Sequence, residues 1–576
     1  MKRNAALLII SLLLLITILP VSIYAEGEDT PDTPDVSVYA TKEQMMDDTF
    51  APNADGTAEN IGIIEFGGNG NLQWYILGKD TGVNGENTVI FAVNNMGGEC
   101  LFGDNNDYVN SEIRAKMNDM VNNNYYFTSA ENSILNETPI SDKINDKLYS
   151  LHADDIGKTI IKAGSYNQIS IAMENYWNNT VPFWLRTPYN NTVMHAKRDV
   201  GTLGTVGYST PLGVHPAANL NLSNVLFASA AKDGSLGPLN KEDLMLLRFD
   251  GSIFDDIDDK EIGEVSYDTN NIYVTVPGER QLFVQGRNDN QNWVYNVNIA
   301  AYGLITKDNI IDDLKGNVSL SLTDIDLSKC KIWIERKIDG LLYAVEAKEA
   351  ISSVDISVEP PVAGYPLITN DVCNTTGIDS TMPLITWYAT DETAIYSKTY
   401  KASITLTPED GYVFVNMNVA GELLQTSAAV KDSIKGENVK VEDVKVNEDG
   451  TLTVKFDLTA KDSIIGIEQP ALTYENGTPI DEFKLPDKVK VTGYSGKEYQ
   501  LAIFPWDAHP DNNYDPECKD EQTLVYLSGL KEIPGGLDYR NPDEPDVKLT
   551  ITIKAAKTSN NTGGNHTVII PNTSVR

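Results

Sequence analysis

The stretch Phe183-Trp184-Leu185-Arg186-Thr187-Pro188 organises the first part of the chain, and Gly213-Val214-His215-Pro216-Ala217 echoes it further on. Short, glycine-punctuated segments run between the two, and an alternating apolar stretch follows at 219–228. This alternation has the period of a β-strand whose two faces differ. The region therefore predicts a set of short strands joined by polar loops.

Upstream of this region the pattern mixes strands with helices. Apolar runs at 61–66, 72–77 and 88–93 predict buried strands separated by glycine-rich turns. The segment 111–121 predicts a helix with Ser111 as its N-cap, since Ile113, Met117, Met120 and Val121 fall on one face. A second helix is expected at 130–135. We therefore predict an α+β module over residues 59–238.

After residue 240 short strands dominate, for example at 272–276, 293–299, 401–407 and 451–456, with turn signals such as Glu409-Asp410-Gly411 between them. Such spacing is typical of tandem β-sandwiches. We expect a multidomain chain with a β-sandwich at 239–350, an immunoglobulin-like repeat at 351–461, an immunoglobulin-like domain at 462–556 and a flexible tail at 557–576.

The N-terminus reads as a secretion signal. Lys2 and Arg3 precede an apolar run from Ala5 to Leu19, and Ala25 supplies a small residue for cleavage. The alternative is an uncleaved membrane anchor, because the run is just long enough to span a bilayer. Residues 26–58 are rich in Asp, Glu, Thr and Pro and predict an extended linker. The protein is thus expected to be extracellular, secreted or held at the cell surface, and to contact membrane only if the signal stays attached.

The chain carries 82 acidic and 45 basic residues, a net charge of −37. This balance excludes nucleic acid as a partner, since phosphate binding needs clustered Lys and Arg. It leaves calcium binding open at carboxylate runs such as 250–259 and 507–521, although neither has EF-hand spacing and both also fit solvated acidic loops. No other cofactor is indicated, and the four scattered cysteines form no C-x-x-C pair.

The motif W-L-R-T-P followed by G-V-H-P-A and L-N-L-S-N-V-L-F-A-S-A-A resembles a secreted Gram-positive family of unknown function, numbered 6273. The strand Trp74 to Leu77 and the helix Asn110 to Asn118 fit the same family, whose usual Arg is replaced here by His215 and whose usual Leu is replaced by Ala218. By architecture, the resemblance implies a C-type-lectin-like fold. The segments 361–364, 386–388 and 400–412 resemble bacterial surface immunoglobulin-like repeats.

Trp184 and Arg186 are two residues apart, so on a strand they share a face and are able to stack on a sugar and hydrogen-bond its hydroxyls. The alternative to a ligand site is that Trp184 packs in the core and Arg186 forms a buried structural ion pair. The candidate ligand-binding residues are Trp184, Arg186, Tyr189, Asn190, His195, Arg198 and Tyr208.

No residue is singled out for catalysis, since the sequence holds neither G-x-S-x-G nor H-E-x-x-H. The sequence favours an adhesin-like protein whose first module binds a glycan or a surface protein and is displayed on β-sandwich spacers. Two alternatives stay open: a secreted polymer-degrading enzyme with accessory sandwiches, and a structural envelope protein without a ligand.

Overall fold

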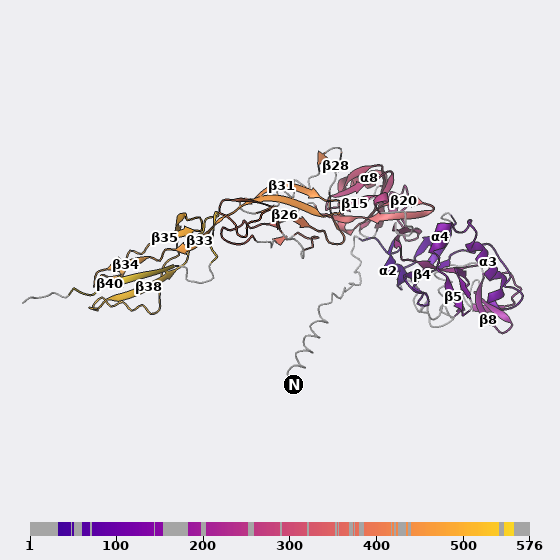
Figure 1. Cartoon of the computed structure of the whole chain (residues 1–576). Coiled ribbons are helices and arrows are strands. Elements are labelled where there is room, and N and C mark those ends of the chain that lie inside the picture. Colours follow the sequence, from indigo (N-terminus) through magenta and orange to yellow (C-terminus); the bar gives the residue numbers. More distant parts are fainter. Residues whose placement is uncertain are drawn as a thin grey trace, which may run out of the picture. The chain divides into compact units, whose positions relative to one another are not determined.

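The computed structural model describes the following residues: 33–47, 49–50, 60–68, 72–142, 144–153, 182–196, 203–250, 259–288, 291–318, 322–351, 354, 356–367, 372–373, 375–379, 385–415, 418–419, 422–423, 434–435, 439–540 and 547–557. The chain is mainly β-sheet, with 46% of residues in strands and 10% in helices, which confirms that β-structure dominates. It divides into two compact units: the first comprises 1–350 and 417–423, and the second comprises 351–416 and 424–576. Figure 1 labels the main elements of both.

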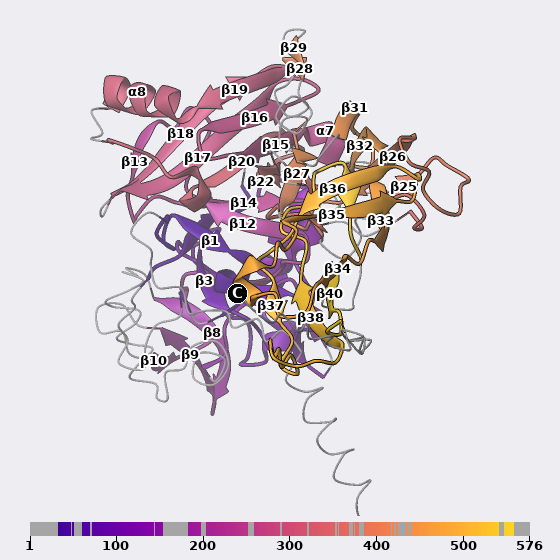
Figure 2. The ribbon, with the colours of Figure 1, turned by 90° about the vertical axis from the view of Figure 1, so that its left-hand side faces the viewer.

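The first unit is built on one 13-stranded sheet. Its main path runs in this order: β13 (Gly237–Leu239), β18 (Gln291–Ile299), β17 (Arg280–Asn288), β20 (Lys331–Ile338), β21 (Leu341–Glu346), β14 (Met245–Phe249), β2 (Ile63–Glu65), β3 (Gln73–Gly78), β4 (Asn87–Ala92), β11 (Ala217–Asn221) and β7 (Leu148–Tyr149). Beside this path, β1 (Tyr39–Thr41) pairs with β12 (Val225–Ser229), which pairs with β14. Figure 2 shows β18, β17 and β20 side by side, with β14 and β12 next to them.

Smaller sheets and short helices surround this sheet. Their strands are β19 (Tyr302–Thr306), β16 (Asn271–Thr275), β15 (Glu264–Tyr267) and β22 (Lys348–Ile351) in one sheet, β10 (Leu203–Val206), β9 (Thr192–Ala196) and β8 (Phe183–Tyr189) in another, and the pair β5 (Thr138–Ser141) and β6 (Ile144–Asp146). The helical elements are α2 (Lys42–Met46), η1 (Tyr108–Asn110), α3 (Glu112–Val121), α4 (Ser129–Ile134), α7 (Asp259–Ile262), α8 (Lys307–Val318) and η3 (Leu327–Lys329).

The two expected helices form for the reasons seen in the sequence. Ser111 caps α3 by accepting a hydrogen bond from the Arg114 backbone N–H at 3.2 Å, and the predicted apolar face of α3 is buried. At α4, Thr128 and Glu131 form a capping box in which each side chain accepts the other residue's backbone N–H.

The expected boundary near residue 239 differs from the structure. Strand β14, which follows that boundary, pairs with β2 and β12, which precede it, and with β21, which follows it. One apolar core runs from Val38 to Ala344. Residues 239–350 are therefore not a separate β-sandwich, since five of their strands (β14, β17, β18, β20 and β21) belong to the 13-stranded sheet shared with the preceding residues.

The expected linker at 26–58 also differs in part. Val38 and Ala40 are fully buried, and β1 pairs with β12. The Asp35 backbone N–H donates to Asn292 Oδ1 at 2.8 Å. Val36 to Val38 form a turn in which the Val38 N–H donates to the Asp35 carbonyl at 3.0 Å, and the strand Tyr39–Thr41 follows it, although the segment before is rich in Asp, Thr and Pro.

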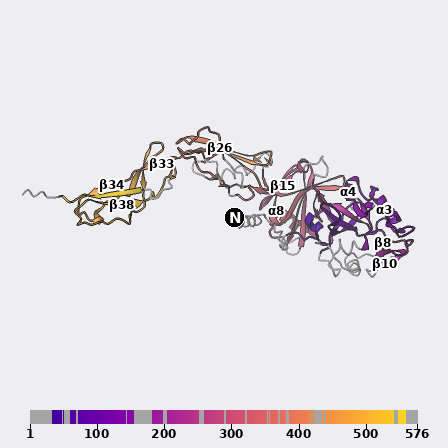
Figure 3. The same ribbon diagram turned by 60° about the horizontal axis from the view of Figure 1, so that its bottom comes forward.

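The second unit consists of two groups of sheets. The first group holds β24 (Val372–Cys373), β23 (Ile356–Ser357) and β30 (Ile434–Lys435), then β25 (Thr386–Trp387), β26 (Thr399–Leu406), β32 (Leu452–Thr459) and β31 (Val439–Val446). The second group holds β36 (Glu498–Ala502), β35 (Lys488–Gly493), β33 (Asp462–Ile467) and β39 (Leu537–Asp538), then β34 (Ala471–Tyr474), β40 (Val547–Ile553), β38 (Gln522–Ser528) and β37 (Asp507–Ala508). Figure 3 shows β26 apart from β34 and β38.

The remaining short elements are β27 (Tyr412–Phe414), η4 (Ile480–Glu482) and the hairpin of β28 (Asn418–Val419) and β29 (Glu422–Leu423). Within the second unit the two groups are joined directly. The Ala363 backbone N–H donates to the Lys461 carbonyl at 3.0 Å, and Ser463 Oγ donates to the Ala363 carbonyl at 2.7 Å. The side chain of Arg540 lies 5.3 Å from the Tyr365 ring centre. The position near 462 is therefore a hydrogen-bonded junction.

Candidate functional site

A cleft of about 710 Å³ opens in the first unit where three strands meet. One edge of β14 pairs with β12. The other edge is shared, since β2 pairs with Met245 and Leu246, and β21 pairs with Arg248 and Phe249. Two strands that follow one another along the same edge leave a gap between their ends. The cleft lies at this gap, and concave pockets are where proteins usually bind small ligands.

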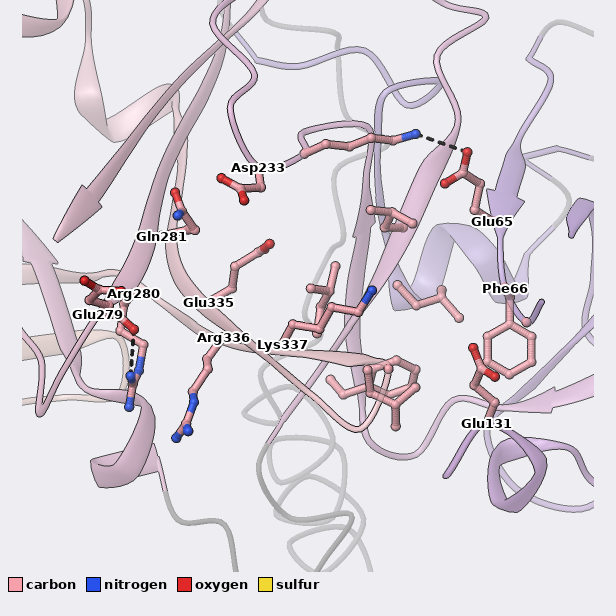
Figure 4. Close-up of a pocket in the computed structure, with 18 of the residues that line it drawn as sticks. Glu65, Phe66, Glu131, Asp233, Glu279, Arg280, Gln281, Glu335, Arg336 and Lys337 are labelled. Atoms are coloured by element: carbon pink, nitrogen blue, oxygen red, sulfur yellow. Dashed lines mark hydrogen bonds and ion pairs between the residues drawn. The ribbon is translucent and has the colours of Figure 1, made fainter. Parts of the chain in front are cut away.

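The cleft is lined by residues from both halves of the sheet (Figure 4). The described lining residues are Glu65, Phe66, Gly67, Glu131, Lys232, Asp233, Leu246, Leu247, Phe249, Glu279, Arg280, Gln281, Asn298, Glu335, Arg336, Lys337, Gly340, Leu341 and Leu342.

The tight turn between β20 and β21 lies against the N-terminus of helix α4. Asp339 and Gly340, which join β20 to β21, both have positive φ angles, 49° and 96°. This is the backbone of a type I′ hairpin turn, and Asp-Gly is a preferred sequence for it. A Cβ atom added at Gly340 would lie 3.7 Å from Cγ2 of Thr128, the N-cap of α4. The hairpin therefore packs against the helix that carries Glu131.

Three of the lining carboxylates are engaged with partners in the protein. Glu65 forms an ion pair with Lys232 at 3.1 Å. Glu131 accepts the Thr128 backbone N–H at 2.8 Å. Glu335 accepts a hydrogen bond from Arg248 Nε at 2.9 Å and another from Trp333 Nε1 at 2.7 Å. These contacts fix the walls in place.

Three basic residues of the lining belong to β17 and β20, namely Arg280, Arg336 and Lys337. Arg280 is buried and donates to the carbonyls of Ile262, Glu279 and Glu261. Burial lowers the pKa of Arg280, and the positive charge of Arg336 lowers it further, while Glu261 acts in the opposite direction. Arg336 and Lys337 are exposed. In Figure 4 the side chains of Arg280 and Arg336 extend on the same side of the view.

Beneath the cleft, Arg248 forms a fully buried polar network. Its guanidinium donates to Glu335, to the carbonyls of Ser229 and Leu246 at 2.7 and 2.8 Å, and to the carbonyl of Ala231. It also lies 5.5 Å from the Trp333 ring centre. Because five donors in a rigid fork suit several acceptors at once, one arginine ties β14 to β20 and to the end of β12.

The structure places Trp184 in the core rather than in a ligand site. Its side chain is fully buried, its Nε1 donates to the Cys100 carbonyl at 2.9 Å, and its ring meets Phe102 edge-on at 5.3 Å. A ring with no exposed face is unable to stack on a sugar. Trp184 is therefore a core residue, which is the alternative stated for it above.

Arg186 holds the loop at residues 149–151. Its Nη1 donates to the Ser150 carbonyl at 2.6 Å, its backbone N–H donates to the Leu151 carbonyl at 3.0 Å, and its guanidinium lies 5.5 Å from the Tyr149 ring centre. Trp184 and Arg186 thus contact different neighbours and do not together form a surface on which a sugar could bind.

Of the remaining predicted residues, Tyr189, Asn190 and His195 lie on the same β8–β9 hairpin as Trp184 and Arg186. Tyr189 is 54% exposed, and Asn190 sits at the turn after β8 with a φ of 49°. His195 is partly buried and is the cross-strand partner of Trp184. Tyr208 packs partly buried against the core. Arg198 lies outside the described residues. None of the six described candidates lines the cleft.

His215 is a buried histidine between two aromatic rings. It is 2% exposed, its Nδ1 lies 3.2 Å from the Ala92 carbonyl, and the Phe183 and Phe91 rings lie 4.8 and 6.1 Å from it. Within the described part of the chain its Nε2 has no hydrogen-bond partner. Burial lowers the pKa of His215 to about 4, against the opposing effect of the Ala92 carbonyl. Folding therefore holds this imidazole neutral.

This burial predicts acid sensitivity of the first unit. The unfolded chain binds a proton at His215 near pH 6.5 and the folded chain only near pH 4, so stability falls as pH drops between these values. The expected loss is about 2 kcal/mol at pH 5 and about 3 kcal/mol at pH 4. Urea unfolding at pH 7, 5 and 4 measures it. The control is His215→Asn, in which the carboxylates titrate as in the wild type. The loss of stability due to His215 is therefore the difference between the two chains at each pH. Identical pH profiles of the two chains would contradict the prediction.

Among the described residues, no group of three or more His, Cys, Asp or Glu side chains could hold a metal ion. Most of the acidic run at 250–259 lies outside these residues, whereas 507–521 lies within them. In the same described part, no helix is long and apolar enough to cross a membrane.

No family model, curated protein or solved structure matches the chain. The cleft therefore has to be interpreted from its own chemistry. Sequence reasoning did not find it, although two local signals were present: Asp339-Gly340 between two apolar runs, and Arg248 within the apolar run Met245 to Phe249. The first is a hairpin signal, and the second places a charge where only a paired one is stable.

Proposed function

We propose that this protein is an extracellular or cell-surface binding protein whose first unit holds its ligand in the cleft between β2 and β21. The observation that carries the proposal is the cleft itself, about 710 Å³, with paired charges in its walls. Its volume lies within the range of ligand pockets in proteins, about 300–1,000 Å³. The immunoglobulin-like sheets of the second unit serve as a spacer in this proposal.

The cellular setting in the proposal comes from the sequence. The Lys2-Arg3 start, the apolar run and Ala25 support secretion. The W-L-R-T-P and G-V-H-P-A motifs support a relation to the unknown-function family numbered 6273, with its lectin-like architecture as a further part of the proposal. The ligand is a surface protein or a glycan of another cell or of the surroundings.

Filling the cleft is expected to weaken ligand binding without unfolding the protein. Leu246 lines the cleft and is partly exposed, so Leu246→Trp places an indole in the ligand's space. Ligands are first identified by incubating the purified chain on glycan and peptide arrays. We then expect Leu246→Trp to weaken binding at least about tenfold, the effect of about 1.4 kcal/mol.

The matched control is Leu304→Trp on β19, since Leu304 is 48% exposed and does not line the cleft. Equal affinity of Leu246→Trp and wild type for every array ligand would refute binding in the cleft. Turnover of an array ligand, seen as new products by mass spectrometry, would replace the binding function by the enzymatic alternative.

A further inference from the structure

The chain passes between the two groups of sheets in the second unit without a free linker. Strand β32 ends at Thr459 and β33 begins at Asp462, so only Ala460 and Lys461 lie between them. The backbone N–H and carbonyl groups of both residues are hydrogen-bonded, at 2.8–3.2 Å, to residues of the first group that precede β26: Lys398, Ser397, Pro361 and Ala363. A hinge needs residues whose backbone angles are free to change. Bending at 460–461 would break these hydrogen bonds.

Side chains also cross from one group to the other. Ser463, which is 1% exposed, donates from its Oγ to the Ala363 carbonyl at 2.7 Å. The Arg540 guanidinium lies 5.3 Å from the Tyr365 ring centre, and its Nε lies 3.3 Å from Asp538 Oδ2 within the second group. A buried hydrogen bond and a cation–π contact therefore join β33 and the chain after β39 to the first group.

The ring of Tyr494, in the second group, packs on the backbone of the first group at Gly364. Gly364 has a φ of 84°, and a Cβ atom added there would lie 2.7 Å from Cδ2 and Cε2 of Tyr494. Both the backbone angle and the available space therefore require glycine at this position. The Tyr494 backbone N–H donates to the Ser463 carbonyl at 2.8 Å, so the ring is held beside β33 although the residue is 52% exposed.

A buried carboxylate holds the turn that carries Tyr494. Asp462 is fully buried, and its two oxygens accept four hydrogen bonds, from the Ser463 N–H at 3.1 Å, the Ser495 N–H at 3.0 Å, Ser495 Oγ at 2.5 Å and the Tyr499 hydroxyl at 3.0 Å. A Cβ atom added at Gly493 would lie 2.1 Å from Asp462 Oδ2, so the chain passes close to the carboxylate on both sides of Tyr494. Hydrogen bonds to an ionised acceptor are roughly twice as strong as neutral ones. Asp462 therefore fixes the position of Tyr494.

We propose that residues 460–463 form a rigid joint between the two groups of sheets, and that Asp462 sets this joint by positioning Tyr494. The two groups have separate apolar cores, one ending at Leu458 and the other beginning at Ile464, so the joint couples them and a shared core does not. The two groups then turn as one body, which flexibly linked sandwiches would not do. This inference goes beyond the proposed binding function and does not depend on where the first unit binds its ligand.

Distances between two spin labels in the full chain test the joint. The labels are attached to a ketone-bearing amino acid at the exposed positions Lys401 on β26 and Lys548 on β40, so the native cysteines stay unmodified. Double electron–electron resonance is expected to give one narrow distance distribution for the otherwise wild-type chain. Tyr494→Ala should widen this distribution about twofold or more, because it removes the contact with Gly364. Asp462→Asn should widen it as well, since an amide group replaces one of the two accepting oxygens.

The matched control is Phe504→Ala, which should keep the wild-type width. Phe504 is 51% exposed, close to the 52% of Tyr494, and its backbone N–H donates to Gly529 within the second group. Melting curves show which variants are folded, and if Asp462→Asn unfolds the second group, Tyr494→Ala decides alone. A broad or two-peaked distribution in the wild type, or equal widths of Tyr494→Ala and Phe504→Ala, would overturn the inference. Either result would leave the proposed function intact, because Leu246→Trp tests ligand binding separately.

Discussion

Replacing Arg248 by methionine is expected to lower the free energy of unfolding of the first unit by about 3–5 kcal/mol. Methionine fills much of the same space but carries no charge. The Glu335 carboxylate would remain buried with Trp333 Nε1 as a donor and without its counter-ion. The carbonyls of Ser229, Leu246 and Ala231 would lose their donors as well. An uncompensated buried charge is the main cost.

Equilibrium urea unfolding, followed by circular dichroism, measures the effect. Adding Glu335→Gln to Arg248→Met removes the unpaired charge, so the double variant should recover part of the lost stability. Arg248→Lys keeps the charge but lacks the forked donors, and it should fall between wild type and Arg248→Met. The exposed neighbour Arg336 provides the control, since Arg336→Gln should change stability by less than about 0.5 kcal/mol. A loss below 1 kcal/mol in Arg248→Met would contradict the structural role.

The same residue links stability to the site. Arg248 lies in β14, the strand whose shared edge creates the cleft, and its ion pair fixes Glu335 in the opposite wall. Loosening this pair should therefore also weaken ligand binding in molecules that stay folded. A variant that is destabilised but binds its ligand with unchanged affinity would separate the two roles.

Local features of the first unit could be predicted from the sequence because they depend on neighbouring residues. The helix at 111–121 follows from one apolar face and the Ser111 cap, and the strands β3 and β4 follow from their apolar runs. The same reasoning failed for Tyr39–Thr41, where a short strand adjoins an acidic, proline-rich segment. Composition over a long window concealed a strand of three residues.

Pairing between distant strands explains most of what the sequence did not reveal. Nothing in the residues of β14 indicates that its two ends pair with β2 and β21, and this arrangement produces both the shared sheet and the cleft. The predicted ligand residues were chosen because Trp, Arg, Tyr and His are common in binding sites. Burial distinguishes a core tryptophan from a binding one, and burial depends on what packs from elsewhere, here Phe102 and the Cys100 carbonyl.

Replacing Trp184 by alanine should destabilise the first unit by about 3–5 kcal/mol, since it empties a large, fully buried site. It also leaves the Cys100 carbonyl without the indole donor. Trp184→Phe keeps most of the volume and loses mainly this hydrogen bond, so its expected cost is about 1–2 kcal/mol. Arg186→Ala should cost a similar ~1–2 kcal/mol, because Arg186 is partly exposed and its Nη1 donates to the Ser150 carbonyl beside the Tyr149 ring.

Urea unfolding followed by circular dichroism ranks the three variants, because a tryptophan substitution would itself alter a fluorescence signal. The order of loss should be Trp184→Ala first, with Trp184→Phe and Arg186→Ala well behind it. Ligand affinity, measured on the folded fraction, should stay within about twofold of wild type in Trp184→Phe and Arg186→Ala, since neither residue lines the cleft. Near-native stability of Trp184→Ala together with lost ligand binding would restore Trp184 as a ligand residue and move the site from the cleft to β8.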